Sequence, residues 1–455
     1  MKKNRWIILA MVFLLLGGCA SGAAPGVSPS PSPTATPQPT EELKTVSGTV
    51  YDASMNTLIL ITDNRKLYSF VTEDVDKRVT EDGIRIGYPV TVGYYGQLDD
   101  NSQEQTVALG YIQVGNFDGL TPREKAQHIL MTLSLEDEVG QMFIVRCPEK
   151  NAAEIQAQYQ FGGYLLFARD FKDKTPGEAS ADIQSCQSSS NIPMLIGVDE
   201  EGGTVNRISL YSQYRSAPFK SPQKLYASGG WDAVEGDTKE KCALLKSLGV
   251  NLNFAPVCDV STDPSDFIYA RSFGKDAEQT SQYVKTVVET MAGTGVGCVL
   301  KHFPGYGNNA DTHTGSAYDS RPLETFESSD FLPFEAGIQA GAGAVLVCHN
   351  VVKCMDASSP ASLSPEVHRI LREDLGFDGV IITDDLSMQA VTDFTGSGSA
   401  ALLAVEAGND LLCCTDYETQ YKAVLEAAQS GGITRERIDD SALRILALKI
   451  SLGIL

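Results

Sequence analysis

The main pattern along the chain is an alternation of short apolar runs and amphipathic stretches, which begins near Asn116 and continues to the C-terminus. The apolar runs are nearly continuous, as in parallel strands covered on both faces, and each is followed by a stretch of helical periodicity. The predicted strands are Gln141–Arg146, Gly163–Phe167, Met194–Val198, Leu252–Pro256, Cys298–Lys301, Ala344–Cys348, Val380–Thr383 and Asp410–Cys413. The predicted helices are Ala152–Tyr159, Ala179–Ser188, Thr238–Ser247, Glu278–Gly293, Thr325–Ala340, Pro365–Leu371, Ala400–Ala407, Tyr417–Gln429 and Asp439–Leu452.

Alternating strand and helix units over residues 116–455 predict an α/β fold, the (β/α)8 or TIM barrel, with insertions in its loops. The last helix is expected to close the outer ring. A doubly wound open sheet is the competing arrangement. No Gly-X-Gly-X-X-Gly turn follows the first predicted strand, so the barrel is the favoured interpretation.

Residues 43–115 show a different pattern, in which apolar and polar residues alternate in short runs separated by turn-forming residues. This pattern is typical of a small all-β module, either an antiparallel barrel or a sandwich. The predicted strands are Thr45–Val50, Thr57–Ile61, Leu67–Val71, Pro89–Tyr95 and Thr106–Val114. The module has no cluster of catalytic residue types, and we interpret it as a spacer or a wall-contact module.

The N-terminal residues 1–19 are typical of a signal peptide, because a basic start precedes the apolar run Ile7–Leu16. That run is too short to span a bilayer, which takes ~20 residues. It ends in Leu16-Gly17-Gly18-Cys19, which resembles a bacterial lipobox and predicts lipid attachment to Cys19. The alternative is an ordinary secretory signal with a chance cysteine.

Residues 20–42 are rich in Ser, Pro and Thr and are predicted to be a disordered tether. With a lipid on Cys19, the chain is expected to be an extracytoplasmic lipoprotein whose membrane partner is reached through that anchor.

The charge and cysteine content exclude several classes of function. A formal net charge of -22 leaves no basic stripe to bind phosphates, so nucleic acid is not an expected partner. Most of the ten cysteines stand singly in apolar runs, as Cys147, Cys258, Cys298 and Cys348 do, and are interpreted as small core residues. No cysteine has zinc-ligand spacing with histidine, so we expect no structural metal and no cofactor.

Polar and charged residues of types that can act in catalysis or ligand binding follow the predicted strands. Because the carboxyl ends of barrel strands share one mouth, these side chains are expected to converge there. A ring of acids and fixed cations suits a ligand with many hydroxyl groups, such as a sugar, although a capping or salt-bridge role is the alternative for any one residue. The residues at the strand ends are Asp199, Glu200, Glu201, Asp259, Lys301, His302, His349, Asn350, Asp384 and Asp385, with Arg271 on a nearby loop.

The loop after the fifth strand carries Asp311-Thr312-His313, and His302 and His313 are two of only five histidines in the chain. In such a loop the carboxylate can accept from one ring nitrogen while the other nitrogen faces a substrate. The alternative is a histidine capped by the aspartate for local turn structure.

Several motifs together resemble glycoside hydrolase family 3, in particular its bacterial β-N-acetylglucosaminidase (β-N-acetylhexosaminidase) branch. The resemblance covers about residues 120–455, with the motifs in the family's order, and does not include the β module or the tether. The motifs are Asp199-Glu200-Glu201-Gly202-Gly203-Thr204-Val205-Asn206-Arg207, Arg271-Ser272-Phe273-Gly274, Lys301-His302-Phe303-Pro304-Gly305, Asp311-Thr312-His313 and Thr383-Asp384-Asp385-Leu386-Ser387-Met388.

The resemblance implies a role for each matched residue. Asp384 is the implied nucleophile of a covalent glycosyl-enzyme, and His313, oriented by Asp311, is the implied general acid/base. This differs from the two-carboxylate arrangement of most glycosidases. The implied ligands of the N-acetylglucosamine hydroxyls are Asp199, Arg207, Arg271, Lys301 and His302.

Three positions depart from the usual motifs of the branch. Tyr306 stands where a second histidine is usual, Thr312 replaces a serine, and Glu200 replaces a glutamine. The first is expected to affect how the loop closes over a substrate, and the other two are mild. None removes an implied catalytic group.

The leading hypothesis for function is therefore a retaining exo-β-N-acetylglucosaminidase that hydrolyses terminal β-linked N-acetylglucosamine in cell-wall-derived glycans or muropeptides. Phosphorolysis on the same scaffold is a close alternative, because a histidine need not repel an incoming phosphate. A β-glucosidase-like specificity is a third possibility, and a catalytically inactive, sugar-binding lipoprotein is a fourth.

Overall fold

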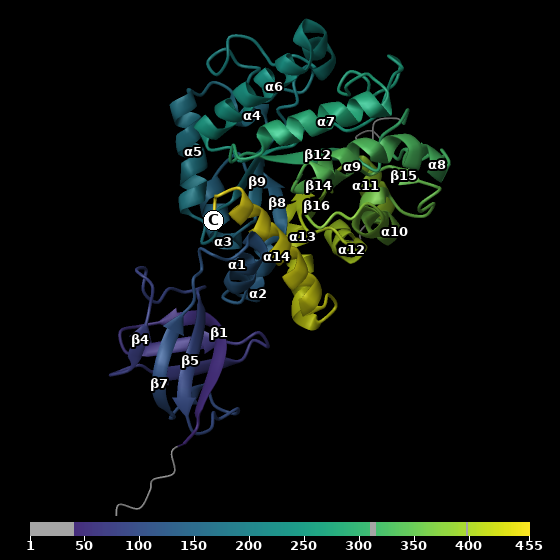
Figure 1. The fold of residues 1–455 in the computed structure, drawn as a ribbon. Coiled ribbons are helices and arrows are strands. Elements are labelled where there is room, and N and C mark those ends of the chain that lie inside the picture. The colour runs from purple at the N-terminus through teal and green to yellow at the C-terminus, as the bar shows by residue number, and fades with distance from the viewer. Residues whose placement is uncertain (1–40, 310–314, 397–398) are drawn as a thin grey trace, which may run out of the picture. The chain divides into compact units, whose positions relative to one another are not determined.

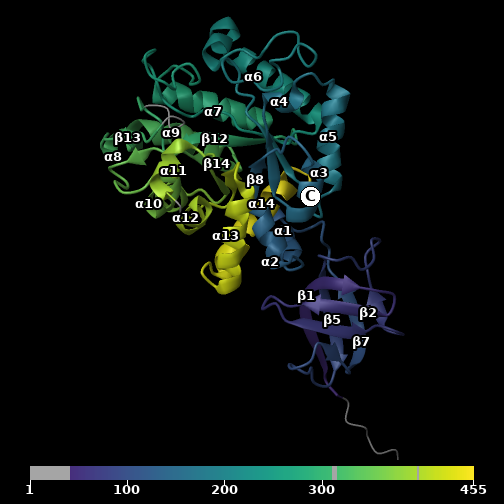
Figure 2. The same ribbon diagram turned by 180° about the vertical axis from the view of Figure 1, so that it is seen from behind.

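The computed structural model describes residues 41–309, 315–396 and 399–455. Figures 1 and 2 show the ribbon from two opposite sides. The predicted signal peptide, Cys19, nearly all of the predicted tether, Asp311 and His313 lie outside the described residues. Within the described part of the chain, no helix combines the length and the apolar character that crossing a membrane requires.

The N-terminal all-β module is one seven-stranded sheet with the strand order β4-β7-β5-β1-β2-β3-β6. Its apolar face buries Leu58, Leu60, Phe70, Val92 and Ile112. The strands are β1 (Leu43–Ala53), β2 (Thr57–Ile61), β3 (Leu67–Val71), β4 (Asp76–Arg78), β5 (Pro89–Tyr95), β6 (Glu104–Gln105) and β7 (Ala108–Val114).

The prediction of a small all-β module is confirmed, but the expected antiparallel pairing does not hold throughout, because the sheet is mixed. Strand β4 pairs with β7 in parallel, and β6 pairs with β3 in parallel. Both additional strands have only two or three residues and lie at the sheet's edges. They are too short to show the alternation from which strands are predicted, and short edge strands also limit pairing with other chains.

The larger part of the chain forms the predicted α/β barrel. Its eight parallel strands follow the order β16-β14-β12-β11-β10-β9-β8-β17. An isolated parallel bridge from Ile382 to Leu411 connects the two end strands, so the barrel is nearly closed. The strands are β8 (Phe143–Arg146), β9 (Gly163–Leu166), β10 (Leu195–Val198), β11 (Leu252–Asn253), β12 (Gly297–Phe303), β14 (Ala344–Val347), β16 (Val380–Thr383) and β17 (Leu412–Cys414), and a separate pair is formed by β13 (Tyr318–Asp319) and β15 (Val351–Val352).

Two of the barrel strands, β11 and β12, differ clearly in length from the prediction. Strand β11 ends at Asn253 instead of Pro256, and a proline cannot donate a main-chain hydrogen bond to a neighbouring strand. Strand β12 continues to Phe303, beyond the predicted Lys301, so both Lys301 and His302 are held within a strand.

Helices surround the strands on the outside of the barrel (Figures 1 and 2). They are α1 (Pro122–Leu130), α2 (Leu135–Gln141), α3 (Ala152–Tyr159), α4 (Ala168–Phe171), α5 (Pro176–Ser188), α6 (Pro222–Leu248), α7 (Ala277–Met291), α8 (Leu323–Thr325), α9 (Phe331–Gln339), α10 (Pro365–Arg369), α11 (Gln389–Thr395), α12 (Ala400–Ala407), α13 (Tyr417–Ser430) and α14 (Arg435–Ser451). Short π-helical segments, η1 (Phe326–Asp330) and η3 (Ile370–Asp374), join α8 to α9 and extend α10, and η2 (Ala361–Leu363) is a 3-10 turn.

The predicted last helix forms and packs against α1. Ala126 and Leu130 of α1 share a buried cluster with Ala442, Leu443 and Leu446 of α14. Sequence analysis did not predict α1 or α2.

Eight of the nine described cysteines are buried thiols, which confirms their interpretation as core residues, and Cys354 is exposed.

Candidate active site

The carboxyl ends of the barrel strands surround a cavity of about 820 Å3. Six of the eight residues predicted to act in catalysis or substrate binding border this cavity, and the other two, Asp311 and His313, lie outside the described residues. The six are Asp199, Arg207, Arg271, Lys301, His302 and Asp384.

Lys301 is the central cation of this mouth. Strand β12 buries its side chain to 3% exposure, and its Nζ lies 2.7 Å from Asp199 Oδ1 and 2.7 Å from Glu201 Oε1. An ammonium group has three N–H donors, so two bind these carboxylates and the third can be offered to a ligand. The structure therefore places Lys301 as a fixed donor rather than a mobile surface charge.

Glu201 joins Lys301 to Arg271. The Arg271 guanidinium donates from Nη2 to Glu201 Oε1 at 2.7 Å and from Nε to Oε2 at 3.0 Å. Burial opposes ionisation of Glu201, but the charges of Lys301 and Arg271 outweigh it and hold the Glu201 pKa well below its usual range. Glu201 was predicted to lie at the mouth as a strand-end residue, but no catalytic or binding role was assigned to it.

His302 has a defined tautomer. Its Nδ1 lies 2.7 Å from Asp259 Oδ2, while Arg271 Nη2 lies 3.1 Å from its Nε2. A guanidinium can only donate, so Nε2 accepts and the ring hydrogen is on Nδ1, which donates to Asp259. Asp259, predicted to lie at the mouth but given no role there, is buried and acts as a positioning residue.

The loop after β10 is organised around Glu200. Its carboxylate accepts from the main-chain N–H groups of Arg207 and Ile208 at 2.8 Å, and from that of Ser209 at 3.2 Å. These bonds fix the segment that carries Arg207, whose Nη2 lies 3.5 Å from Asp199 Oδ2. A carboxylate at this position has the acceptors that three converging N–H groups require.

Tyr306, which stands in place of the usual histidine, is buried beside the site. Its main-chain N–H donates to Asp259 Oδ1 at 2.7 Å. Its ring lies 5.7 Å from the His302 ring in an edge-on arrangement and 5.7 Å from the Phe267 ring. The tyrosine thus supports the same histidine–aspartate pair through packing.

The described ends of the loop that follows β12 are anchored to its surroundings. Arg321 donates to both Asp319 and Asp330, and Asn309 donates to Asp319 at 2.8 Å. Gly305 has a φ of +121°, and a Cβ there would lie 2.4 Å from Asp330 Oδ1, so the close approach requires glycine.

The two acids after β16 have different surroundings. Asp385 accepts from the hydroxyl and main-chain N–H of Ser387 and from the Thr415 hydroxyl, so it organises the turn. Asp384 Oδ1 accepts the Asp385 N–H at 2.9 Å, and its own N–H donates to the Val347 carbonyl oxygen at 3.1 Å. Because its backbone is tied to β14, Asp384 is held at the cavity by two neighbouring strands.

Two further residues on the wall of the mouth, Arg146 and Phe167, were not predicted as site residues. Arg146 ends β8, and its guanidinium carbon lies 4.6 Å from the centre of the Phe167 ring. The guanidinium carbon of Arg207 lies 5.5 Å from the same ring. An arginine at the end of a strand carries no sequence signal that separates it from an ordinary surface charge.

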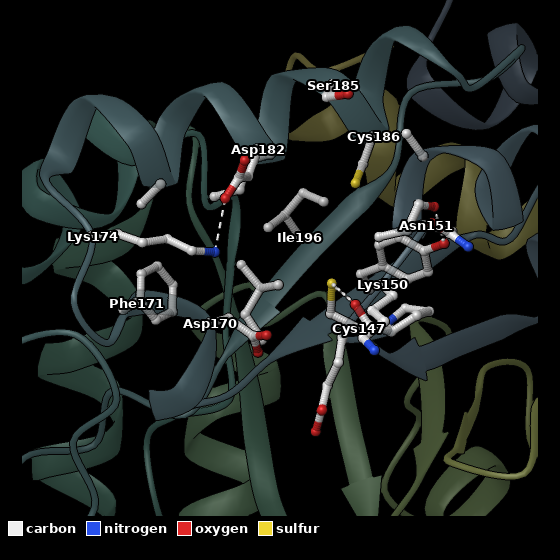
Figure 3. A pocket seen from close by; sticks show the side chains of 18 of the residues that line it. Cys147, Lys150, Asn151, Asp170, Phe171, Lys174, Asp182, Ser185, Cys186 and Ile196 are labelled. Atoms are coloured by element: carbon white, nitrogen blue, oxygen red, sulfur yellow. Dashed lines mark hydrogen bonds and ion pairs between the residues drawn. The ribbon is translucent and has the colours of Figure 1, made fainter.

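A second cavity, of about 380 Å3, contains none of the predicted site residues. Figure 3 shows Cys147 and Cys186 on its wall together with the Lys174–Asp182 ion pair, which measures 2.8 Å. Burial raises the pKa of Cys186 to about 11 and that of Cys147 further, so both are unreactive thiols. Within the described residues, no three His, Cys, Asp or Glu side chains are grouped to hold a metal ion.

Comparisons with known proteins agree with this geometry. Residues 134–448 match the family model described as Glycosyl hydrolase family 3 N terminal domain. The chain is 36% identical over 257 residues to a Beta-hexosaminidase of Xanthomonas campestris pv. campestris, covering 55% of this chain and 76% of that protein. It is 31% identical over 333 residues to Beta-hexosaminidase LpqI of Mycobacterium tuberculosis, covering 70% of this chain and 83% of that protein.

A solved structure is similar as well. The glycoside hydrolase family 3 beta-N-acetylglucosaminidase from Paenibacillus sp. str. FPU-7 superposes with a TM-score of 0.65 at 32% sequence identity. The match covers 71% of this chain and 63% of that chain, so this chain spans less than two thirds of that structure's length.

Proposed function

The chain belongs to glycosyl hydrolase family 3, in its β-hexosaminidase branch, and from this premise we propose that it is a retaining, exo-acting β-N-acetylglucosaminidase. Its proposed substrates are cell-wall-derived glycans with a terminal β-linked N-acetylglucosamine. The observation that carries the proposal is the buried network of Lys301, Asp199, Glu201 and Arg271, which borders the same cavity as Asp384.

In the proposed first step, a carboxylate oxygen of Asp384 attacks the anomeric carbon, and the bond from that carbon to the leaving oxygen breaks. His313 gives its proton to the leaving oxygen. Lys301, Arg271 and Arg207 border the cavity and favour the ionised form of a nearby carboxylate. In the second step, His313 takes a proton from water, whose oxygen displaces Asp384, and the sugar leaves with its original configuration.

The network supplies both kinds of partner that a sugar hydroxyl needs. Lys301 and Arg207 offer N–H donors, and Asp199 offers carboxylate acceptors. Because these groups already hold one another at 2.7 to 3.5 Å, little reorganisation is needed when a sugar binds. His302 is held in one tautomer by Asp259 and Arg271, which favours a single bound orientation.

The deciding experiment measures p-nitrophenol release from the β-N-acetylglucosaminide and the β-glucoside, each with and without phosphate. The proposal predicts turnover of the N-acetylglucosaminide without phosphate and much slower turnover of the glucoside. A strict requirement for phosphate would identify a phosphorylase instead, and absence of turnover on both glycosides would refute the proposed activity.

The nucleophile is tested by covalent labelling. A fluorinated N-acetylglucosamine donor that forms a slowly hydrolysed intermediate is expected to add its mass to the peptide that contains Asp384. The assignment is wrong if the sugar is found on Asp385 or Asp199.

A further inference from the structure

We propose that Arg146 is a specificity residue that binds a carboxylate carried by the glycan substrate. The inference rests on the proposed function, because it assigns a substrate class to the same mouth. It adds a contact outside the set Asp199, Arg207, Arg271, Lys301 and His302.

The first observation is the pairing of charges in the mouth. Lys301 lies against Asp199 and Glu201, Arg271 against Glu201, and Arg207 against Asp199. Arg146 borders the same cavity, yet no carboxylate of the described residues lies within ion-pair distance of it. Asp170 interacts with the Arg146 charge only at longer range. The cavity wall at β8 therefore carries a positive charge without a direct ion pair among the described residues.

The second observation is the way Arg146 is held. Its guanidinium lies over the Phe167 ring at 4.6 Å, and Arg207 shares that ring at 5.5 Å. The Nε atoms of both arginines are buried without a hydrogen-bond partner. Stacking fixes the plane of a guanidinium and directs its N–H groups along that plane. Two like charges beside one ring also repel, which an anion bound between them would relieve.

The chemistry of the guanidinium selects the ligand. A planar carboxylate accepts two parallel N–H donors at once, whereas a neutral hydroxyl or ester accepts more weakly. Strand β17 separates β8 from β16 in the barrel order, so Arg146 and Asp384 occupy nearby sectors of one cavity. The proposal therefore places the carboxylate of the bound sugar at Arg146 and the scissile bond at Asp384, within this one cavity. A free phosphate could bind the same guanidinium through its oxygens. The experiment below distinguishes a carboxylate on the glycan from free phosphate.

The test compares two substrates that differ in one charge. They are N-acetylglucosamine β-1,4-linked to N-acetylmuramic acid, whose lactyl ether carries a carboxylate, and the methyl ester of the same disaccharide. For each enzyme the measured quantity is the ratio of kcat/KM for the acid to kcat/KM for the ester. We expect the wild-type protein to prefer the acid, and Arg146→Met to lower the ratio roughly 10- to 100-fold, the scale of a charge-assisted hydrogen bond.

Conservative and control variants separate the charge from packing. Arg146→Lys keeps a positive charge but not the bidentate fork, so its ratio is expected to lie between those of the wild type and Arg146→Met. Lys239→Met removes a positive charge from an exposed position on α6 and is expected to keep the wild-type ratio.

A ratio in Arg146→Met within about twofold of the wild type would overturn the proposal. It would also be overturned if phosphate accelerated cleavage of both disaccharides in the wild type but not in Arg146→Met, because the bound anion would then be free phosphate. Wild-type cleavage of the aryl N-acetylglucosaminide with no preference for the acid refutes only the role of Arg146. Failure to cleave any of these substrates refutes the proposed function itself.

Discussion

Glu201→Gln tests whether the buried charge network stabilises the barrel. The substitution keeps the shape of the side chain but removes the negative charge that Lys301 and Arg271 share. The wild-type side chain is 2% exposed, accepts from Arg271 at 2.7 and 3.0 Å, and lies 2.7 Å from Lys301 Nζ. In the variant, an amide replaces one oxygen, and its N–H donors face cations that cannot accept them.

Removal of one partner from a buried ion pair costs about 3–5 kcal/mol. Lys301 retains Asp199 at 2.7 Å, so we expect the lower part of this range, a loss of about 3 kcal/mol in the free energy of unfolding at pH 7. The measurement is equilibrium urea unfolding followed by circular dichroism, with linear extrapolation to water. Glu235→Gln on α6 is the matched control, because its pair with Lys239 is exposed and should contribute less than about 1 kcal/mol.

The pH dependence gives a second check. The folded-state pKa of Glu201 lies below the ~4.3 of an unfolded glutamate, so its stabilisation is present above that value and is lost as the pH falls through the folded-state pKa. The difference between wild type and variant should therefore stay constant from pH 5 to 8. A loss below about 1 kcal/mol, or a difference that disappears within this pH range, would refute the reasoning.

Three other predictions concern separate parts of the chain. His313→Ala should lose hydrolysis of a natural disaccharide but retain much of the first step on an activated aryl glycoside, with azide restoring turnover; equal loss on both substrates and no azide effect would make His313 a structural residue. Burial lowers the pKa of Lys449 to about 7, so from pH 7 to ~10.4 this group is protonated only in the unfolded chain and its own contribution to the unfolding free energy rises with pH. In urea titrations the unfolding free energy of the wild type should therefore increase relative to that of Lys449→Met as the pH rises, and a difference that stays constant with pH would contradict the prediction. Cys19→Ala should abolish palmitate labelling, and labelling equal to the wild type would show that the lipid is attached elsewhere.

Much of the fold could be predicted because most of the barrel strands are short, nearly uninterrupted apolar runs. Val380–Thr383 was predicted with its observed bounds, since a strand covered on both faces leaves an uninterrupted apolar run. The short helices α1 and α2 were missed because their apolar positions are few and polar residues dominate their first turns. Helix α6 is much longer than the predicted Thr238–Ser247, because it comprises two helical segments joined by a kink at Gly229 and Gly230, whose backbone angles are not helical.

The cluster at the mouth could be predicted from strand ends, but the division of roles within it could not. Asp199, Glu200 and Glu201 are adjacent acids of similar type. The fold turns Glu200 toward main-chain N–H groups and Glu201 toward Arg271 and Lys301. The partners of Glu200 belong to its own loop, whereas those of Glu201 come from a loop and a strand far along the chain, so residue type alone does not distinguish the three acids.

The incomplete closure of the barrel determines on which side of strand β16 the sheet opens more easily. On one side it pairs with β14 at four successive positions, from Ala344–Val380 to Val347–Thr383. On the other side the strand pairing is a single bridge, from Ile382 to Leu411. It is supplemented by the Thr383 hydroxyl, which accepts the Cys413 N–H at 2.9 Å, and by main-chain bonds from Asp410 N–H to the Ile381 oxygen and from Leu386 N–H to the Cys413 oxygen. Local opening follows the side with fewer bonds, so amide hydrogen exchange should be faster along β17 than along β14. Asp384, whose N–H donates to the Val347 oxygen, would stay attached to β14 during such an opening.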